Sequence, residues 1–374
     1  MAQQRFTPQD PVSSDFREAI GAQITAFLDD RAALTRAIGP ELAPLQQLAS
    51  EFTAGGKRFR PAFCYWGHVA IAGAPEQDDW LLQAAASLDL LHVSALVHDD
   101  VMDGSDTRRG APSVHRQLET WHRDEGGRGP SDAFGRAGAI LLGDLLLVWS
   151  TEMFDHADLP QATRRAATAV LEAMRAEVTC GQFLDVVAQT RLFGQADPLD
   201  PSQLQAELDR VNRVVDYKSA RYSVRHPLEL GATLAGAEEQ TLRALVAYGS
   251  LVGRAFQFRD DLLGVFGSAE LTGKPIGDDL REGKRTVLVA HALAEAPPAQ
   301  AAELDAMLGD PTLDDDQVAR ARQIITAAGA DQAVETDIAA SIEVALEHLA
   351  GARVSDEGRL ALETLAGVVV NRSA

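Results

Sequence analysis

Lysine is almost absent from this chain. Of its 34 basic residues only four are lysines, Lys57, Lys218, Lys274 and Lys284, and each has a Gly, Ser or Arg neighbour. An ammonium is a compact point charge whereas a guanidinium is a planar fork, so an arginine-rich chain is expected to keep lysine where a point charge is needed. The four lysines are therefore candidate ligand-binding residues.

Positive charge, aromatic residues and cysteine are also scarce. The net charge of -21 argues against nucleic acid and an anionic membrane surface as partners. Aromatic residues make up 6% of the chain and strict apolar/polar alternation is hard to find, so we expect far more helix than strand. Cys64 and Cys180 lie in apolar helical patterns without a CxxC motif, which favours reduced core residues of a cytoplasmic protein.

Long uninterrupted hydrophobic runs are missing as well. The most apolar segment, residues 137–149, contains Gly143 and Asp144, and the sequence opens without a signal-peptide pattern, so we expect no transmembrane segment. Residues 1–13 are polar, include two prolines, and are expected to form a flexible tail. Residues 14–374 show neither a repeat nor a clear boundary, and we expect a single all-α domain.

The most informative stretch is residues 91–115, LHVSALVHDDVMDGSDTRRGAPSVH. Its apolar spacing predicts a helix that ends near Asp103, so Asp99 and Asp103 share a face with Cβ atoms about 5–6 Å apart. Two such carboxylates repel each other unless a cation lies between them, and oxygen ligands suit Mg²⁺. Arg108 and Arg109 follow at once and predict an anion site beside the metal site.

An isolated acid pair of this spacing is more often solvated helix surface. Two observations favour a site instead. The helix that leads to Asp99 is apolar for several turns, so the acids end a buried element. A second pair, Asp260 and Asp261 in GRAFQFRDDLLGVFG, ends another apolar helix.

Basic groups accompany the first acid pair. In residues 54–61, AGGKRFRP, two glycines allow close approach of the backbone to a ligand, and Lys57 and Arg60 add charge. Without its companions this segment would be interpreted as a plain loop. His92 lies two turns before Asp99 on nearly the same face, and either donates to a phosphate or is satisfied by the backbone.

Three further segments carry polar groups of the kind such a site needs. They are GQFLD with Gln182 and Asp185, a predicted helix with Lys218, Ser219 and Tyr222, and LTGKPIGDDLREGKRT at residues 271–286. Each also has an ordinary interpretation, as a polar stripe on a helix or as a linker. Together the groups exceed what one phosphate needs, and the economical arrangement is a helical cavity that holds two diphosphates, one of them through Mg²⁺.

The motifs resemble those of trans-type isoprenyl diphosphate synthases of the polyprenyl synthetase family. The match covers GGKRFRP, HDDVMD with SDTRRG, GQFLD, YKSARYS, FQFRDD and GKPIGDDLREGKRT, in that family's order, over residues 55–286. The resemblance implies an all-α isoprenoid synthase bundle around a central cavity and a homodimer. It also implies a reaction that joins isopentenyl diphosphate head to tail to an allylic diphosphate.

The resemblance implies roles for individual residues as well. Asp99 and Asp103 would bind two Mg²⁺ on the allylic diphosphate, and Asp260, helped by Asp261, would bind a third. The same diphosphate would be contacted by Arg108, Lys218 and Lys274. Isopentenyl diphosphate would be bound by Gly56, Lys57, Arg60, His92 and Arg109. The reacting centre, where the departing pyrophosphate takes the proton, would be lined by Ser219, Tyr222 and Gln257. Metals and cations would neutralise the leaving group, and a water-free cavity would protect the carbocation.

One position departs from the family pattern. The second aspartate motif usually ends in a third acid, and here Gly264 stands in that place. The first acid of the motif could still hold the metal, so we expect an active enzyme with room for weaker metal binding. This DDxxG form resembles a branch of the family, and the chain is most similar to geranylgeranyl diphosphate synthases.

Product length is predicted from helix geometry. The growing chain should pass Ser94 and Ala95, one turn before Asp99, and both are small where short-chain members usually place an aromatic residue. The floor should then lie at least one turn deeper, near Leu91 or Leu90, and one turn is about 5.4 Å, roughly one isoprene unit. From dimethylallyl, geranyl or farnesyl diphosphate we therefore expect the C20 product, geranylgeranyl diphosphate.

Several alternatives stay open. A farnesyl or longer-chain polyprenyl synthase would differ only in the cavity floor. A class I terpene cyclase shares an aspartate-rich helix but has no use for a second diphosphate site at Lys57, Arg60 and Arg109. An inactive partner subunit would need damage to the first aspartate motif or the lysines, and these are intact.

Overall fold

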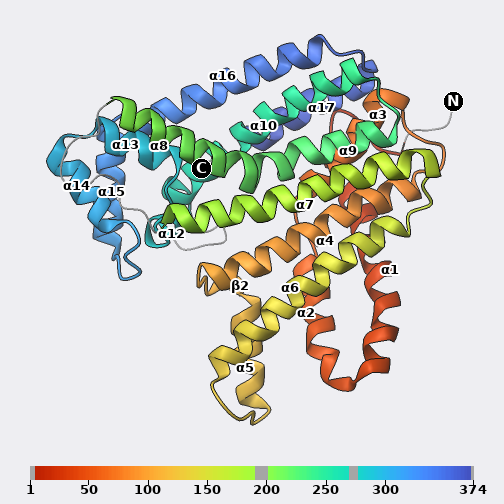
Figure 1. The fold of residues 1–374 in the computed structure, drawn as a ribbon, viewed down its shortest axis with the longest axis horizontal. Coiled ribbons are helices and arrows are strands. Elements are labelled where there is room, and N and C mark those ends of the chain that lie inside the picture. The colour runs from red at the N-terminus through yellow and green to blue at the C-terminus, as the bar shows by residue number, and fades with distance from the viewer. Residues whose placement is uncertain (1–4, 190–200, 269–276, 372–374) are drawn as a thin grey trace. The chain divides into compact units, whose positions relative to one another are not determined.

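The computed structural model describes residues 5–189, 201–268 and 277–371, and these are almost entirely helical (Figure 1), which confirms the predicted all-α class. By internal contacts the chain forms two compact units. The first unit takes the described residues up to 165 together with Gly231–Gly236 and Ser355–Thr364, and the second takes the rest. Because each unit combines distant segments, a search for a linear boundary in the sequence finds none.

The first unit is built around α4 (Asp79–Met102), which packs along α6 (Ser131–Asp155) and also contacts α1 (Ser14–Ile38) and α3 (Phe59–Ala72) (Figure 1). Most of α4 is buried, because its apolar residues cover the whole circumference rather than one stripe. The smaller elements are η1 (Pro40–Leu42), α2 (Ala43–Thr53), β1 (Thr107–Arg108), β2 (Ala111–Pro112) and α5 (Val114–Asp124).

Small residues let α4 and α6 approach closely. The Ser94 hydroxyl donates to the Gly143 carbonyl oxygen at 2.7 Å. A Cβ at position 143 would lie 2.3 Å from His98 Nε2, so glycine lets the His98 ring keep its present position against α6. Gly143, which interrupts the apolar run in the sequence, is therefore a packing residue between two helices.

Two helices, α4 and α6, are long and apolar enough to cross a membrane when judged by length and composition alone. In the most apolar window of α4, 72% is buried inside the protein, as is typical of a core helix. Such a match is weak evidence for a membrane span.

The N-terminal segment differs from the flexible tail that the sequence predicts. The Phe6 side chain is 2% exposed and meets the rings of Phe16 and Tyr65 edge-on, with centroids 5.2 and 5.3 Å apart. The indole nitrogen of Trp66 donates to the Pro11 carbonyl oxygen at 3.0 Å. Each aromatic pair contributes about 0.5–1.5 kcal/mol beyond its buried area, so the described part of this segment is packed rather than loose.

The second unit is centred on α10 (Glu239–Phe266), which packs along α16 (Ala330–Ala350) and against the π-helix η2 (Val215–Arg225). It also holds most of α7 (Gln161–Gln189). Its other helices are α8 (Pro201–Val214), α12 (Asp278–Arg281), α13 (Val287–Glu295), α14 (Pro298–Met307) and α15 (Asp315–Ala327). Both units share α9 (His226–Leu234) and α17 (Asp356–Val370).

The two cysteines have different surroundings. Cys64 of α3 is buried, as predicted, and burial raises the pKa of its thiol. Cys180 of α7 is exposed, so its assignment to the core was wrong. The apolar pattern around it misled the prediction because neighbouring Phe183 and Leu184 are exposed as well.

Candidate active site

The end of α4 leads into a two-stranded hairpin that the sequence did not predict. Thr107 of β1 pairs with Pro112 of β2, and Arg108 pairs with Ala111. Arg109 and Gly110 form the turn, with φ of 55° and 77°, the sign that a two-residue hairpin turn requires. Because Arg108 lies in a strand and Arg109 at the tip, these adjacent arginines reach different partners.

Arg108 is bound to the aspartates of α4. Its Nε donates to Asp100 Oδ1 at 2.9 Å, its Nη2 also contacts that oxygen, and Nη2 lies 3.9 Å from Asp99 Oδ2. Asp100 is 1% exposed. Sequence reasoning set Asp100 aside because it points away from the Asp99 face, but a carboxylate directed into a core needs a cationic partner, and that signal was available.

Arg109 lies against the glycine loop of residues 54–58. Its Nη1 donates to the Phe52 carbonyl oxygen at 3.4 Å, and its Nη2 lies 3.7 Å from the place that a Cβ on Gly56 would take. Gly55 and Gly56 have φ of 70° and 93°, so the loop needs residues without a Cβ. The structure thus places Arg109 beside this loop, and the assignment of both to isopentenyl diphosphate stays a prediction.

Arg58 anchors the same loop from inside. Its Nη1 lies 2.6 Å from Asp89 Oδ2 of α4, and its Nη2 donates to the Thr53 carbonyl oxygen at 2.9 Å. Arg58 and Asp89 are 7% and 5% exposed, and Arg58 has a φ of 55°, a strained value for a residue with a Cβ. Lys57, the preceding residue, is exposed. The sequence did not distinguish these neighbouring cations, and only Lys57 was assigned to a ligand.

A cluster of guanidinium groups surrounds His92. Burial lowers the pKa of His92 well below its usual value, and the positive charges of Arg60, Arg109, Arg108 and Arg58 lower it further. The imidazole is therefore neutral at pH 7. Arg60 is itself 9% exposed, and burial together with neighbouring arginines also lowers the pKa of Arg109. Arg58 and Arg60 are buried, Arg108 is half-buried and Arg109 is exposed. This concentration of positive charge favours an anionic ligand.

The predicted chain-length residues divide between two sides of α4. Ala95 is half-buried and lies one turn before Asp99, and Leu91, another turn back, is 3% exposed. Ser94 instead is buried against α6 through its bond to Gly143. Of the two small residues only Ala95 follows the Asp99 face, because a helix turns about 100° per residue.

In the second unit, Lys218 of η2 binds Asp185 of α7. Lys218 Nζ donates to Asp185 Oδ2 at 2.6 Å. The close approach depends on Gly181, where a Cβ would lie 2.3 Å from the Lys218 backbone nitrogen. The GQFLD motif therefore supplies both the room for η2 and the carboxylate for its lysine. Gln182, on the next position, is half-buried.

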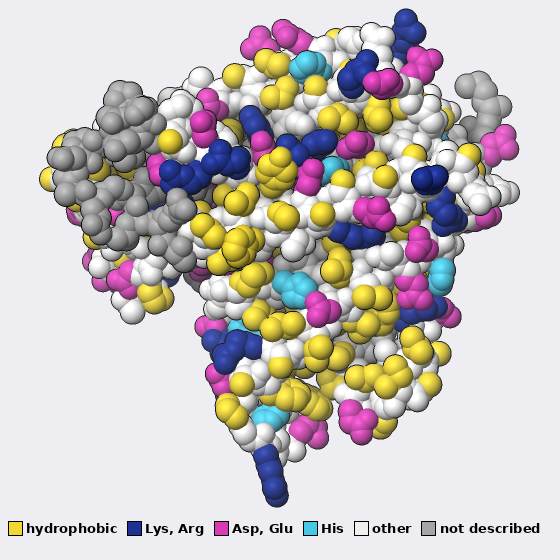
Figure 2. Space-filling view, viewed as in Figure 1, with side chains coloured by type: hydrophobic (Ala, Val, Ile, Leu, Met, Phe, Trp, Pro, Cys, Tyr) yellow, Lys and Arg dark blue, Asp and Glu magenta, His cyan; other side chains and the backbone are white. Residues whose placement is uncertain are grey.

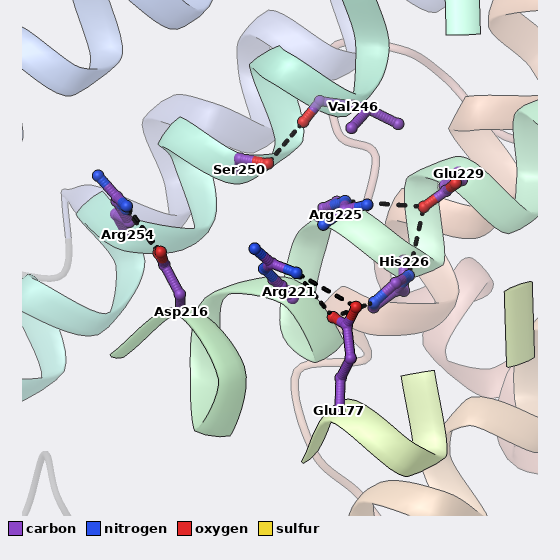
Figure 3. Close-up of polar contacts among 9 residues, drawn as sticks. All are labelled: Glu177, Asp216, Arg221, Arg225, His226, Glu229, Val246, Ser250 and Arg254. Carbon is purple, nitrogen blue, oxygen red and sulfur yellow. Dashed lines mark hydrogen bonds and ion pairs between the residues drawn. The ribbon is translucent and has the colours of Figure 1, made fainter. Parts of the chain in front are cut away.

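The π-helix η2 is tied down at both ends (Figure 3). Near its start, Asp216 accepts two hydrogen bonds from Arg254 of α10 at 2.6 and 2.7 Å. Near its end, Glu177 of α7 accepts from Arg221 at 3.1 Å and pairs with His226 at 2.9 Å. Burial opposes the charged form of Glu177, but these two partners outweigh it and hold its pKa below the usual value.

Three predicted site residues lie between these anchors, namely Lys218, Ser219 and Tyr222. Ser219 is half-buried and Tyr222 is 8% exposed. π-Helical turns are rare and occur frequently at functional sites. Two ion pairs to neighbouring helices give η2 the rigidity that a binding residue such as Lys218 needs.

The second aspartate pair stands near the end of α10. Gln257 Nε2 donates to Asp261 Oδ1 at 2.7 Å, and Asp261 is 5% exposed. Burial, together with the charges of Asp279 and Asp260, raises the pKa of Asp261 to about 8 against the opposing effects of Gln257 and Lys284. At pH 7 without a bound cation the Asp261 carboxyl is mostly protonated.

Asp279 of α12 completes this acidic group. Its Oδ1 lies 3.0 Å from Lys284 Nζ, which is also 2.5 Å from Glu282 Oε2. Lys274, the remaining predicted lysine, lies outside the described residues. Within the described ranges, no three His, Cys, Asp or Glu side chains are already arranged as a metal centre. The donors are all oxygens, the ligand type that Mg²⁺ prefers.

Apolar helices that end in aspartate pairs, with arginines and lysines gathered beside them, define the class of helical isoprenoid synthases. The family model for polyprenyl synthetases matches residues 43–325, and the chain belongs to this family. Its members are prenyltransferases, which confirms the predicted reaction class.

Relatives with different products resemble this chain. It is 32% identical over 322 residues to (2E,6E)-farnesyl diphosphate synthase of Mycobacterium tuberculosis, an alignment of 85% of this chain and 80% of that one. It is 30% identical over 324 residues to geranylgeranyl diphosphate synthase of Saccharolobus solfataricus, covering 86% and 88%. A crystal structure of geranylgeranyl pyrophosphate synthase from Corynebacterium glutamicum, complexed with isoprenyl diphosphate and magnesium, matches with a TM-score of 0.87, 37% identity and coverage of 96% and 99%.

Proposed function

We propose that this protein condenses isopentenyl diphosphate head to tail with allylic diphosphates and releases mainly geranylgeranyl diphosphate. The observation that carries the proposal is the arrangement at the end of α4, where Asp99 lies beside Arg108 and the charges of four arginines act on His92. Carboxylates that can take a metal next to cations that can take an anion suit two diphosphates, one bound through Mg²⁺ and one bound directly.

The acidic residues present fit Mg²⁺. Asp99 and Asp103 at one place and Asp260 with Asp261 at the other offer only oxygen donors, and we assign two ions to the first pair and one to the second. Bound Mg²⁺ would neutralise the charge that develops on the leaving diphosphate. Fixed positive charges near the leaving group would come from the protein itself. Asp100 holds Arg108 in place, and Asp185 holds Lys218 in place.

The chemistry then needs no nucleophilic side chain. The allylic carbon–oxygen bond breaks, the pyrophosphate leaves with the bonding electrons, and the double bond of isopentenyl diphosphate attacks the allylic cation. Loss of a proton to the departing pyrophosphate restores the double bond. Neutral His92 and the arginines around it hold the second diphosphate, while Ser219, Tyr222 and Gln257 line the reacting centre and exclude water.

The C20 product follows from the face of α4 that carries Asp99. Ala95 leaves room one turn away from the diphosphate, and buried Leu91 closes the path after a further turn of about 5.4 Å. Ser94 is bound to Gly143 and contributes little to this floor.

The direct test is an incubation of purified protein and Mg²⁺ with isopentenyl diphosphate plus dimethylallyl, geranyl or farnesyl diphosphate in turn. Chromatography of the dephosphorylated products should show one dominant C20 alcohol from each primer. A C15 product, or products of C30 and longer, would keep the reaction and contradict the assigned floor. No elongation with any primer would contradict the proposed function and favour a cyclase or an inactive partner subunit.

We include a homodimer in the proposal. On α6 the apolar side chains of Leu141 and Val148, seven residues apart, are 60% and 61% exposed. Figure 2 shows hydrophobic side chains at the surface over α5 and α6, in the lower half of the view. An apolar face on one helix suits the same face of a second copy. Light scattering should give twice the chain mass, and Leu141→Glu with Val148→Glu should give a monomer.

A further inference from the structure

The backbone of η2 lies directly against its two neighbouring helices. On α10, a Cβ at Gly253 would lie 2.4 Å from the Ala220 carbonyl oxygen. On α7, Gly181 leaves the same kind of room for the Lys218 backbone. These glycines set how closely η2 packs, but glycine presents no side-chain ridge that would set the rotation of a helix. The polar anchors of η2 are therefore the candidates for that task.

The last turn of η2 has the wide winding of a π-helix. The backbone nitrogen of His226 donates to the carbonyl oxygen of Arg221, five residues earlier, and this is the hydrogen bond that defines π winding. In an α-helix two residues five apart point about 140° away from each other, because each residue turns the helix by about 100°. In π winding the same two residues lie on nearly one side of the helix. Arg221 and His226 can therefore bind one partner only while this turn keeps its π winding.

Glu177 of α7 is that shared partner (Figure 3). Its two carboxylate oxygens accept from Arg221 Nη1 at 3.2 and 3.1 Å, and its Oε2 lies 2.9 Å from His226 Nε2. Because its pKa is held below the usual value, Glu177 is ionised at pH 7 and can only accept, so His226 Nε2 carries a hydrogen. One side chain of α7 thus joins the two residues whose backbones form the π hydrogen bond.

Both donors are held from other sides as well. His226 is 2% exposed, and Glu229 Oε2 lies 3.3 Å from its Nδ1. The Arg221 guanidinium lies over the Tyr217 ring, 4.0 Å from the ring centroid. Glu177 therefore meets two donors that are already oriented, and we call Glu177, Arg221 and His226 the Glu177 clamp.

We propose that Glu177 is a positioning residue for the allylic diphosphate, because its clamp keeps η2 in π winding. Lys218 and Ser219 lie just before the clamped turn. If this turn relaxed to α winding, both would rotate around the helix relative to His226 by about 100°, the angle of one residue. Lys218 would then leave Asp185, which it now meets at 2.6 Å. The inference rests on the proposed function for the identity of the ligand.

The test measures binding rather than turnover. Calorimetry with Mg²⁺ present follows isopentenyl diphosphate and, separately, a geranyl diphosphate analogue whose bridging oxygen is replaced by sulfur, which resists cleavage. Glu177→Gln keeps the shape of the side chain but removes its charge, and should weaken analogue binding by about 10- to 100-fold. Binding of isopentenyl diphosphate should stay unchanged, since the residues assigned to it lie in the first unit.

Matched variants separate positioning from general damage. His226→Gln, whose amide nitrogen can replace the imidazole Nε2, should retain the analogue affinity, whereas His226→Leu should lose it as Glu177→Gln does. Glu303→Gln removes the same charge from another arginine pair of the second unit, where Arg320 donates to Glu303 at 2.7 and 2.8 Å, and should change neither affinity. Adding Glu177→Gln to Arg221→Gln with His226→Leu should cost nothing more, because the three residues act as one unit.

The winding itself is tested without any ligand. Hydrogen exchange of the amides in residues 215–226, followed by mass spectrometry, should accelerate by about 10- to 100-fold in Glu177→Gln and stay unchanged in Glu303→Gln. This measurement also separates the two proposals. Absent elongation and absent analogue binding by the unaltered protein would contradict the proposed function, while the exchange rates still report on the Glu177 clamp.

Three results would overturn the inference. They are unchanged analogue affinity in Glu177→Gln, an equal loss of affinity for both ligands, and unchanged exchange in residues 215–226. If thermal unfolding shows that Glu177→Gln fails to fold, Arg221→Gln, which leaves the contact between Glu177 and His226 in place, decides by the same three criteria.

Discussion

The two aspartate pairs end two long helices, α4 and α10, yet their surroundings have opposite charge. In the first unit Arg108 binds buried Asp100, and further arginines collect one or two turns away. In the second unit the charges that raise the pKa of Asp261, after burial itself, belong to Asp279 and Asp260. The adjacent aspartates at the end of α4 therefore lie among arginines, whereas the adjacent aspartates near the end of α10 lie close to another acid.

This difference separates two ways of compensating a buried carboxylate. Asp100 is compensated by a protein cation, so its charge is stable without any ligand. For Asp261 the positive charge of Lys284 opposes the shift but is outweighed by burial and by the charges of Asp279 and Asp260, so its carboxyl is mostly protonated at pH 7 without a bound cation. The first region thus pairs its buried carboxylate with arginine, whereas in the second region Asp261 is mostly protonated at pH 7 without a bound cation.

The largest effect on stability is expected when a buried arginine of the first unit loses its charge. Arg58→Ala leaves Asp89 buried without its partner and should lower the free energy of unfolding by about 3–5 kcal/mol. Chemical denaturation measures this loss. Arg17→Ala, at an exposed position of α1, is the control and should change stability by less than about 0.5 kcal/mol. Equal losses in the two variants would show that the Arg58 pair does not anchor the glycine loop.

The next largest effect should be on kcat, which we expect to fall by different factors when an aspartate of each pair is replaced. Asp99→Asn removes a carboxylate assigned to two metal ions and should lower kcat by about 10²- to 10³-fold. Asp261→Asn resembles the protonated carboxyl and should cost about 10- to 100-fold, as for a residue that supports a metal ligand. Steady-state kinetics at saturating Mg²⁺ measures both. A larger loss in Asp261→Asn than in Asp99→Asn would reverse the comparison.

The pH dependence of folding stability should reveal the protonation of Asp261 in the second unit. The pKa of Asp261 is raised from 3.8 to about 8 in the folded chain, so between these values the folded state binds the extra proton. Without metal, its contribution to stability is therefore complete below pH 4 and is lost as pH rises through about 8. Thermal unfolding in a chelator should show this loss, while Asp261→Asn should not. Added Mg²⁺ should oppose the loss, and an identical profile for both proteins would contradict the assigned protonation.

The smallest effect on rate, with the clearest effect on product, is expected along α4. Ala95→Phe blocks the path one turn from Asp99 and should shorten the product, whereas Leu91→Ala opens the floor and should lengthen it. Ser94→Ala, next to Ala95 but bound to Gly143, is the matched control and should leave chain length unchanged. Product chromatography with a farnesyl diphosphate primer measures all three. Unchanged products from Ala95→Phe and Leu91→Ala would refute the floor.

Several features could be predicted because they depend on neighbours in the sequence. The helical period identified α4 and α10, and the i and i+4 spacing placed Asp99 and Asp103 on one face. The hairpin was missed because its strands are two residues long, too short for any alternation to appear. Phe6 was missed because an isolated aromatic residue in a polar segment carries no period, although its ring is buried against Phe16.

Other features depend on partners far away in the sequence. Nothing local indicates that Arg58 pairs with Asp89, or that Asp279 fills the space beside Gly264. The direction of Ser94 likewise depends on Gly143 of α6, which lies 49 residues later in the chain. Sequence reasoning therefore identified the chemical groups but could not decide which cation compensates which acid.

The amino-acid sequence by itself determined the helices, the residue types at their ends and the family to which they belong, because periodicity and motif order are properties of the linear chain. Tertiary structure alone decided which aspartate is charged and which glycine is required. Those outcomes depend on the dielectric surroundings, on free volume and on the nearest opposite charge, and all three are set by helices that meet only after the chain has folded.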